Sequence, residues 1–202
     1  MHQSSIEKMT SFRDKYLSER KQDPLQILDL GSQDVNGTYR PLFSTLPWRY
    51  IGIDMALGEN VDVVLHTPYD WKEIGSESVD VIISGQAFEH IQYFWITILE
   101  IARALKPGGI LCILAPSSGP EHRYPMDCWR FYPDGMASLG YFAQLEVLEA
   151  TTQWENKGYP DDSDCWHDSM LVCRKPNKGL FLNTKSNLIR WIQHKAITLG
   201  LQ

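Results

Sequence analysis

The chain has 202 residues, of which 43% are hydrophobic and 22% are charged. These values are typical of one globular domain with a substantial core. The formal net charge of -6 argues against nucleic acid as the main partner, because the sequence offers no basic stripe for phosphates.

The sequence also lacks membrane and secretion signals. No apolar run approaches the length of a membrane span, and the N-terminus lacks the basic-then-apolar layout of a secretory signal. No Cys-x-x-Cys pair is present, and Cys112 and Cys173 lie in apolar runs, as buried thiols in a reducing compartment do. We therefore expect one cytoplasmic domain over residues 1–202, without a membrane span, as a monomer or a homodimer.

The apolar pattern predicts helices and strands that alternate along the first half of the chain. An amphipathic helix is expected over residues 4–22, capped by Ser4 or Ser5 and stopped by Pro24. Strands are expected from about Leu25 and over 49–53, 61–65, 79–83 and 110–114, with helices within 38–47 and over about 94–105. This alternation predicts βαβ units and a mostly parallel sheet.

The pattern changes after Pro116. Residues 116–135 are rich in aromatic residues, prolines and polar groups without a clear period, which predicts a long loop that acts as a lid. A short helix is expected over 136–143, strands over 145–150 and 170–173, and a C-terminal amphipathic helix over 185–199.

The most informative motif lies in residues 26–37. An apolar run ends in Asp29-Leu30-Gly31 and a polar segment follows, as in a buried strand that opens into a tight loop. Gly31 allows a sharp turn and close approach of a ligand. The next apolar strand ends in Asp54, and a carboxylate there can accept hydrogen bonds from ribose hydroxyls. The two strand ends predict a nucleoside pocket; the alternative is an ordinary strand-turn-helix without a ligand.

The composition of this loop favours one class of nucleoside. The dinucleotide fingerprint and the P-loop are both absent, since Gly31 and Gly37 are its only glycines and no Gly-Lys-Ser/Thr follows. Asp29 and Asp34 also place negative charge where a pyrophosphate would lie. A carboxylate-lined pocket favours a cationic ligand, and S-adenosylmethionine fits through its sulfonium, its ammonium and its ribose diol.

Five motifs, in this order, resemble the class I S-adenosylmethionine-dependent methyltransferases of the type 11 group. They are Leu28-Asp29-Leu30-Gly31-Ser32, Gly52-Ile53-Asp54, Val79-Asp80-Val81-Ile82-Ile83-Ser84, Phe88-Glu89-His90-Ile91 and Leu105-Lys106-Pro107-Gly108-Gly109. The resemblance implies an α/β, Rossmann-like, doubly wound sheet of about seven strands. The sheet should be mostly parallel with an antiparallel last strand and helices on both faces.

The resemblance also implies which residues bind the cofactor. Asp29 and Gly31 should hold the methionine end, Asp54 the ribose, and residues 84–86 should lie beside the sulfonium. The full expected set is Asp29, Gly31, Ser32, Gln33, Asp54, Met55, His66, Thr67, Ser84, Gly85 and Gln86. Two features depart from the family pattern. Val35 occupies the position of the third glycine, and His66 or Thr67 stands where an acid usually contacts adenine.

Methyl transfer requires an aligned acceptor and, for a hydroxyl or ammonium acceptor, the loss of a proton. Histidine suits this second task because its pKa lies near neutrality. The candidate catalytic residues are His122 first, His167 second, and the pair Glu89 and His90. The alternatives are that Glu89 and His90 only cap the following helix and that His167 lies in a surface loop.

The lid combines flat aromatic faces with charged groups, which suits a polyhydroxylated or aromatic acceptor. The expected substrate contacts are Arg123, Tyr124, Asp127, Trp129, Arg130 and Tyr132. The alternative is a proline-stiffened loop whose aromatic residues cover the sheet and whose charges pair with each other. We expect no metal, since His122, Cys128, Cys165 and His167 match no common zinc spacing.

We interpret the chain as a methyltransferase that uses S-adenosylmethionine to methylate a small molecule. An oxygen atom, as in a hydroxyl of a sugar or a secondary metabolite, is the expected acceptor. The alternatives are a small-molecule N-methyltransferase and a non-catalytic regulatory protein that binds S-adenosylmethionine.

Overall fold

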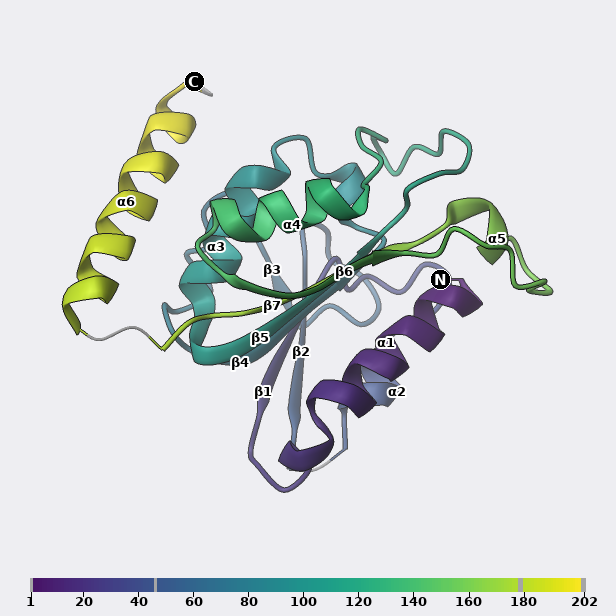
Figure 1. Ribbon diagram of the computed structural model, residues 1–202, viewed down its shortest axis with the longest axis horizontal. Helices are drawn as coiled ribbons and strands as arrows, with labels where there is room; N and C mark the ends of the chain where they lie inside the picture. Colours follow the sequence, from purple (N-terminus) through teal and green to yellow (C-terminus); the bar gives the residue numbers. More distant parts are fainter. Residues whose placement is uncertain (1, 46, 178–179, 201–202) are drawn as a thin grey trace.

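A single seven-stranded sheet organises the computed structural model, which describes residues 2–45, 47–177 and 180–200 (Figure 1). Its strand order is β3-β2-β1-β4-β5-β7-β6. The strands are β1 (Gln26–Leu30), β2 (Arg49–Asp54), β3 (Val63–Val64), β4 (Val79–Gly85), β5 (Leu105–Ala115), β6 (Glu146–Thr152) and β7 (Ser169–Arg174). Strand β7 is antiparallel to β5 and β6, and the other neighbouring pairs are parallel. The predicted doubly wound sheet with an antiparallel last strand is confirmed.

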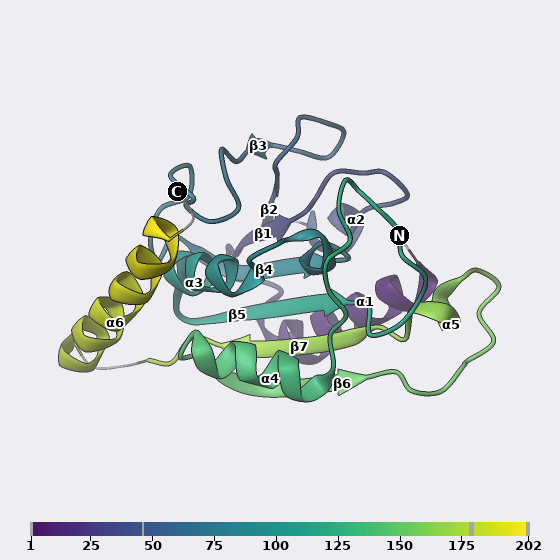
Figure 2. The ribbon, with the colours of Figure 1, turned by 90° about the horizontal axis from the view of Figure 1, so that it is seen from above.

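Helices cover both faces of this sheet. They are α1 (Gln3–Tyr16), α2 (Arg40–Phe43), α3 (Phe94–Ala104), α4 (Pro133–Phe142), α5 (Ser163–Trp166) and α6 (Leu180–Leu199), with 3-10 turns η1 (Ser18–Arg20) and η2 (Phe88–His90). Figures 1 and 2 show α3 and α4 on one face and α1 and α2 on the other. Each face therefore has its own hydrophobic core.

The apolar run of β4 explains its central place. Ile82 packs in the core on the α3 side, whereas Val81 and Ile83 pack in the core on the α1 side. All three side chains are fully buried. A strand covered on both faces must be apolar at consecutive positions, because successive side chains point to opposite faces.

Several predicted elements differ from the observed ones in extent. The first helix ends at Tyr16 and a 3-10 turn follows, so it does not continue to residue 22. Neither Ser4 nor Ser5 caps it: His2 is the N-cap residue, and both serines are buried inside the helix. The third strand is limited to Val63–Val64 because the Asp62 carboxylate, rather than a strand backbone group, accepts the Gly52 N–H at 2.7 Å.

Three further differences concern helices. The helix expected within 38–47 covers only Arg40–Phe43, and Leu46 lies outside the described residues. Helix α4 begins at Pro133, inside the segment predicted as lid, because proline favours the first turn of a helix. Helix α6 begins at Leu180, earlier than predicted, and lies beside α3 at the edge of the molecule (Figure 1). None of the described helices has the length and apolar character needed to cross a bilayer.

Candidate active site

The carboxyl ends of four neighbouring parallel strands, β2, β1, β4 and β5, meet at one edge of the sheet. In the register, Leu30 lies beside Ile53 on one side and Ser84 on the other, and Ser84 lies beside Ile113. The loops that leave these strands therefore converge, as they do at the ligand-binding edge of doubly wound folds.

Asp29 is the buried acid of this edge, with 2% of its surface exposed. The Tyr50 hydroxyl donates a hydrogen bond to its Oδ2 atom. Burial raises the pKa of Asp29 to about 7, and this effect outweighs the hydrogen bond from Tyr50 and the charge of Arg40, both of which lower it. A cationic group at this edge would favour the ionised form of Asp29.

The turn after β1 depends on glycine at one position. Gly31 has φ of +79°, and a Cβ atom there would lie 2.4 Å from the Cβ of Ala87. The amides of Gly31 and Ser32 both donate to the Ile53 carbonyl, at 2.9 and 3.2 Å. Val35, at the third glycine position of the family pattern, is exposed and therefore does not crowd this turn.

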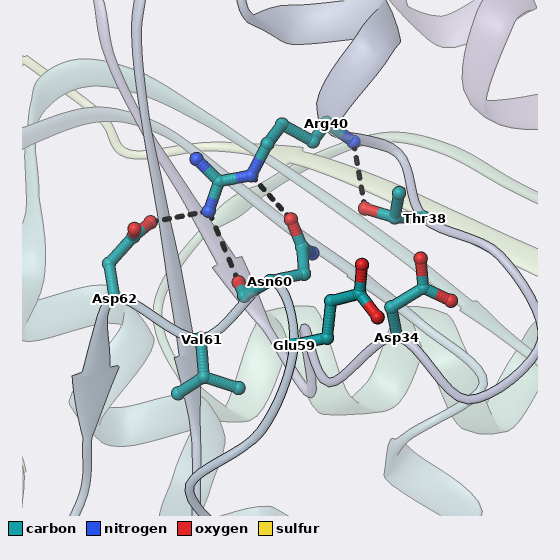
Figure 3. A pocket seen from close by; sticks show the side chains of 7 residues that line it. All are labelled: Asp34, Thr38, Arg40, Glu59, Asn60, Val61 and Asp62. Atoms are coloured by element: carbon teal, nitrogen blue, oxygen red, sulfur yellow. Dashed lines mark hydrogen bonds and ion pairs between the residues drawn. The ribbon is translucent and has the colours of Figure 1, made fainter.

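A polar hollow of about 360 Å³ lies beside this turn (Figure 3). The Arg40 guanidinium crosses it, donating to the side chain and the carbonyl of Asn60 and to Asp62. The Asn60 amide in turn donates to the Ser32 carbonyl at 2.7 Å and to the Tyr50 hydroxyl at 3.0 Å. Asn60 therefore links the hollow to the Tyr50–Asp29 pair and fixes the loop that carries Ser32.

Asp54, at the end of β2, is held by backbone amides. Its Oδ2 atom accepts from the Gln33 amide at 3.1 Å, and its Oδ1 atom accepts from the amides of Met55 and Ala56 at 2.7 and 3.2 Å. A carboxylate oxygen accepts more than one hydrogen bond, so Asp54 keeps acceptor capacity toward a ribose. Met55 is exposed next to it.

His66 and Thr67 lie in the loop after β3. The His66 amide donates to Glu73 Oε1 at 3.3 Å, and Thr67 Oγ1 accepts from the Tyr69 amide, also at 3.3 Å. These contacts fix the loop backbone, and the imidazole of His66 is exposed. The contact between this loop and adenine stays a prediction.

The residues of the turn after β4 differ in role. Ser84 is fully buried and its hydroxyl donates to the Leu30 carbonyl at 2.9 Å, which ties β4 to β1. Gly85 leaves room for Tyr39, whose hydroxyl would lie 2.0 Å from a Cβ atom. Gln86 has φ of +57°, and its amide donates to Asp168 Oδ1 at 2.9 Å. Gln86 thus connects the turn to the start of β7.

The N-terminal turn of α1 is bound to the same edge. Ser4 donates to Asp168 Oδ2 at 2.7 Å, and the hydroxyls of Ser5 and Tyr39 share a hydrogen bond of 2.5 Å. Asp168 and both serines are buried. This polar network, which also contains Gln86, holds α1 against the strand ends.

Three of the four catalytic candidates lie together beyond β4 and β5. Single ligand atoms of Glu89, His90 and His122 all lie within 4.8 Å of one another. His90 Nε2 is 3.8 Å from Glu89 Oε1, and the rings of His90 and His122 meet edge to face at 4.8 Å. We call these three residues the acid–histidine cluster.

Glu89 is the innermost member of the acid–histidine cluster, and its side chain is fully buried. Neither carboxylate oxygen has a hydrogen-bond partner among the described residues. Burial raises its pKa to about 8. Its backbone carbonyl accepts hydrogen bonds from the amides of Cys128 and Trp129, at 2.7 and 3.2 Å. These two bonds hold the lid against η2.

His122 is positioned by an ion pair within the lid. Asp127 accepts from both terminal nitrogens of Arg130, at 2.6 and 2.9 Å, and from the His122 amide at 2.8 Å. His122 Nδ1 lies 3.3 Å from Asp127 Oδ2. The Arg130 pair and the neighbouring hydrogen bonds hold the pKa of Asp127 well below its usual range, so a full negative charge faces the imidazole.

The other expected substrate contacts are more dispersed. Arg123 pairs with Glu121 at 2.7 Å on the surface, and Tyr124 is exposed. Trp129 donates to the Gln92 carbonyl at 3.1 Å, and Tyr132 stacks on Trp154 at 6.0 Å between ring centroids. The lid charges Asp127 and Arg130 pair with each other, as the alternative interpretation of the lid expected.

His167 does not join the acid–histidine cluster. Its Nδ1 atom is 2.7 Å from the Gln153 carbonyl, and its backbone is left-handed with φ of +46°. Trp166, one residue earlier, is the side chain that reaches the cluster: its ring meets that of His122 at 4.7 Å.

Known proteins resemble this chain in sequence and in fold. Residues 28–113 match the sequence family described as methyltransferase domain. The 1,6-didemethyltoxoflavin-N1-methyltransferase of Burkholderia thailandensis, solved with 1,6-didemethyltoxoflavin and S-adenosylhomocysteine, aligns with a TM-score of 0.64 and 15% identity over 86% of this chain and 79% of that one. Residues 28–113 therefore resemble a methyltransferase domain in sequence, and the chain has the fold of a methyltransferase.

Two further solved structures share this fold. An S-adenosylmethionine-dependent methyltransferase from Archaeoglobus fulgidus aligns with a TM-score of 0.57 and 13% identity over 85% of this chain and 95% of that one. The [4+2]-cyclase SpnF aligns with a TM-score of 0.62 and 14% identity over 84% and 81%. No curated protein matches the chain significantly.

Sequence reasoning missed several residues of this candidate site. Tyr50, Ser4, Ser5 and Tyr39 form its polar network, and Trp166 forms a wall of the acid–histidine cluster. The first four occupy positions typical of strand or helix cores, so their pattern carried no signal. A signal for Trp166 existed in Gly119, which has a left-handed φ of +95° and where an added Cβ atom would lie 2.4 Å from that ring.

Proposed function

We propose that this protein is a class I methyltransferase that uses S-adenosylmethionine to methylate a hydroxyl group of a small molecule. The observation that carries the proposal is the position of the acid–histidine cluster. Its residues follow β4, which neighbours the strand β1 that bears Asp29, and β5, which lies on the other side of β4. A cofactor held at the strand ends would therefore present its methyl group toward side chains able to receive a proton.

The edge of the sheet at which β2, β1, β4 and β5 end, called here the cofactor edge, has the chemistry to bind a cationic nucleoside. Asp29 and Asp54 supply carboxylates for an ammonium and a ribose diol, and the left-handed turn at Gly31 leaves its backbone uncovered by a side chain. Bound S-adenosylmethionine supplies an electrophilic methyl group on a positively charged sulfur. Gln33 and Met55, whose amides meet at Asp54, would border the ribose.

The acid–histidine cluster would handle the acceptor. As the acceptor oxygen forms its bond to the methyl carbon, the carbon–sulfur bond breaks, and its electron pair stays on a sulfur that becomes neutral. The acceptor hydroxyl must also lose its proton. Glu89, His90 and His122 lie close enough together to receive that proton or to pass it to solvent. Trp166 and the lid would exclude bulk water from this space.

A small amine is the second candidate acceptor. The Glu89 carboxylate is buried and lacks a hydrogen-bond donor among the described residues, so an ammonium group could pair with it. Proton loss would then precede attack by nitrogen.

Two measurements test the proposal. Calorimetric titration with S-adenosylhomocysteine tests cofactor binding, and its absence in the folded protein would contradict the proposal at its first step. Methyl transfer from labelled S-adenosylmethionine to panels of phenols, sugars and amines then tests the acceptor class. Transfer to amines alone would assign the second candidate, and tight cofactor binding without any transfer would favour a non-catalytic role.

A further inference from the structure

We propose that the acid–histidine cluster binds a divalent transition-metal ion such as Zn²⁺, Fe²⁺ or Mn²⁺. The role of this metal ion in methyl transfer rests on the proposed function. The binding of the ion to the cluster does not. The starting observation is that two imidazoles and one carboxylate bring their ligand atoms within 4.8 Å of one another. Two histidines and one carboxylate form a common metal-binding set that leaves positions open for other ligands.

Glu89 provides the second, independent observation. Its side chain is fully buried, and both oxygens lack a hydrogen-bond partner among the described residues. Buried charges in proteins are paired or coordinate metals, and the carboxylate of Glu89 lies beside two potential ligands rather than a cation.

The histidines are oriented as metal ligands require. His90 Nδ1 contacts the Met126 carbonyl, which only accepts, so the ring proton is on Nδ1 and Nε2 keeps its lone pair. That Nε2 atom is the one 3.8 Å from Glu89. Metal-bound histidines almost always donate their other N–H to a carbonyl or a carboxylate.

A carboxylate also lies beside the Nδ1 atom of His122, at an ion-pair distance but without hydrogen-bond geometry. Its Nδ1 atom faces Asp127 Oδ2 at 3.3 Å, and Asp127 is fixed by Arg130. This arrangement orients the Nε2 lone pair of His122 away from Asp127. Asp127 is therefore a positioning residue of the proposed site rather than a ligand.

The distances require a modest contraction on binding. Ligand atoms about 2.1 Å from a tetrahedral ion lie about 3.4 Å from one another. The present separations, which are at most 4.8 Å, must therefore close by up to about 1.4 Å. The cluster had no signal in sequence spacing, because Glu89 and His90 are adjacent while His122 comes from the loop after another strand. Imidazole ligands favour a transition metal over Mg²⁺ or Ca²⁺.

A metal here would act on the acceptor as a Lewis acid. It would coordinate the acceptor hydroxyl and lower its pKa, and the released proton would pass to solvent water. The acceptor hydroxyl could then lose its proton without a free histidine as the base.

The test is metal binding by the full chain after treatment with a chelator. A Cys165→Ser background removes an exposed thiol that could bind metal by itself. We expect one Zn²⁺ per chain by calorimetry and a visible absorption band with Co²⁺. Glu89→Gln and His122→Gln should each weaken Zn²⁺ binding more than about 100-fold, because changes outside the ligand shell alone cost about 10–100-fold. The control His167→Gln should bind normally.

The experiment separates the proposed metal site from the proposed methyltransferase function. Glu89→Gln should fold, since it removes a buried charge; if it does not, His90→Gln gives the same test from a more exposed position. Absence of stoichiometric binding by the parent chain, or retention of Zn²⁺ by these variants, would overturn the metal site. Titration of the same metal-free samples with S-adenosylhomocysteine tests the proposed function independently.

Discussion

Tyr50 donates its hydroxyl hydrogen to the carboxylate of Asp29, and both side chains are buried beneath the turn at Gly31. This pair lets a carboxyl group remain in the core without a cation in contact. The same burial raises the pKa of Asp29 to about 7 and makes the group responsive to pH near neutrality.

The first prediction concerns the pH dependence of cofactor binding. The groups that face Asp29 are Tyr50 and Asp54 from β2, Tyr39, and Arg40 from α2. A cationic ligand favours ionised Asp29, so below pH 7 binding must release the proton of this group. Affinity for S-adenosylmethionine should therefore fall about tenfold per pH unit below 7 and level off above it. Calorimetry in buffers of different ionisation enthalpy measures the release.

Asp29→Asn is the control for this effect, and it should abolish the proton release. Its free energy of unfolding supplies a second measurement. Folded Asp29 holds a proton between its ordinary pKa of 3.8 and about 7, whereas the unfolded chain does not. Stability of the parent chain should thus decrease as pH rises through this window, by up to about 4 kcal/mol. An equal slope in the Asn variant would contradict the assignment.

The second prediction concerns the turn after β1. Gly31→Ala should lower the free energy of unfolding and weaken cofactor binding, because it combines a left-handed backbone with a contact of 2.4 Å to Ala87. Gly108→Ala is a matched control: its φ is +78°, and nothing lies within 4 Å of the added Cβ. The control should lose only the strain of a left-handed residue, about 1–2 kcal/mol. Equal denaturation midpoints for the two variants would show that the Ala87 contact has no cost.

The third prediction concerns the carboxylate at the end of β2. Asp54→Ala should reduce the free energy of cofactor binding by about 1.5–3 kcal/mol, the range for hydrogen bonds to charged groups. Asp62→Ala is the comparison, since Asp62 also accepts a backbone amide but lies at the hollow beside Arg40. Titration with S-adenosylhomocysteine distinguishes them. Similar losses in both variants would indicate a general effect on the loops rather than ribose binding.

The sequence predicted the sheet well because its strands are buried on both faces. Runs such as residues 79–83 have no amphipathic alternative, and the glycine and acid at strand ends mark the edge directly. Elements whose form depends on partners far away in sequence were predicted less well. Ser4 and Ser5 resembled helix caps, yet the distant Asp168 and Tyr39 draw them into the interior.

In the candidate site, too, local features could be predicted from the sequence and contacts between distant segments could not. The residue types of the acid–histidine cluster were visible in the sequence, and the lid was visible as an aperiodic segment. Their meeting was not, because it depends on the Glu89 carbonyl accepting two amides from the lid. A one-residue error in the segment before β7 has large consequences: Trp166, not His167, contacts the cluster.

The fourth prediction concerns the attachment of α1. Ser4→Ala removes one of the two side chains among the described residues that donate hydrogen bonds to the buried Asp168 carboxylate, the other being Gln86. The free energy of unfolding should fall by about 1–3 kcal/mol, because a buried acceptor is left less satisfied. Ser18→Ala, at an exposed serine after α1, should stay within about 0.5 kcal/mol of the parent. Chemical denaturation compares the two, and equal stability would exclude the Ser4–Asp168 bond as an anchor.

The last prediction separates the two histidines of the catalytic hypothesis. His122 lies in the acid–histidine cluster with Asp127 behind it, whereas His167 contacts the Gln153 carbonyl. Once an acceptor is known, His122→Ala should lower turnover by about 100- to 10,000-fold at saturating cofactor, the range for losing a group that assists proton transfer. It should leave S-adenosylhomocysteine affinity unchanged, since His122 lies outside the cofactor edge. His167→Ala should lower turnover less than about threefold, because its ring does not reach the cluster. Initial rates of labelled methyl transfer provide the comparison. If His122→Ala slows transfer less than tenfold, catalysis depends on alignment of the two substrates and not on this cluster.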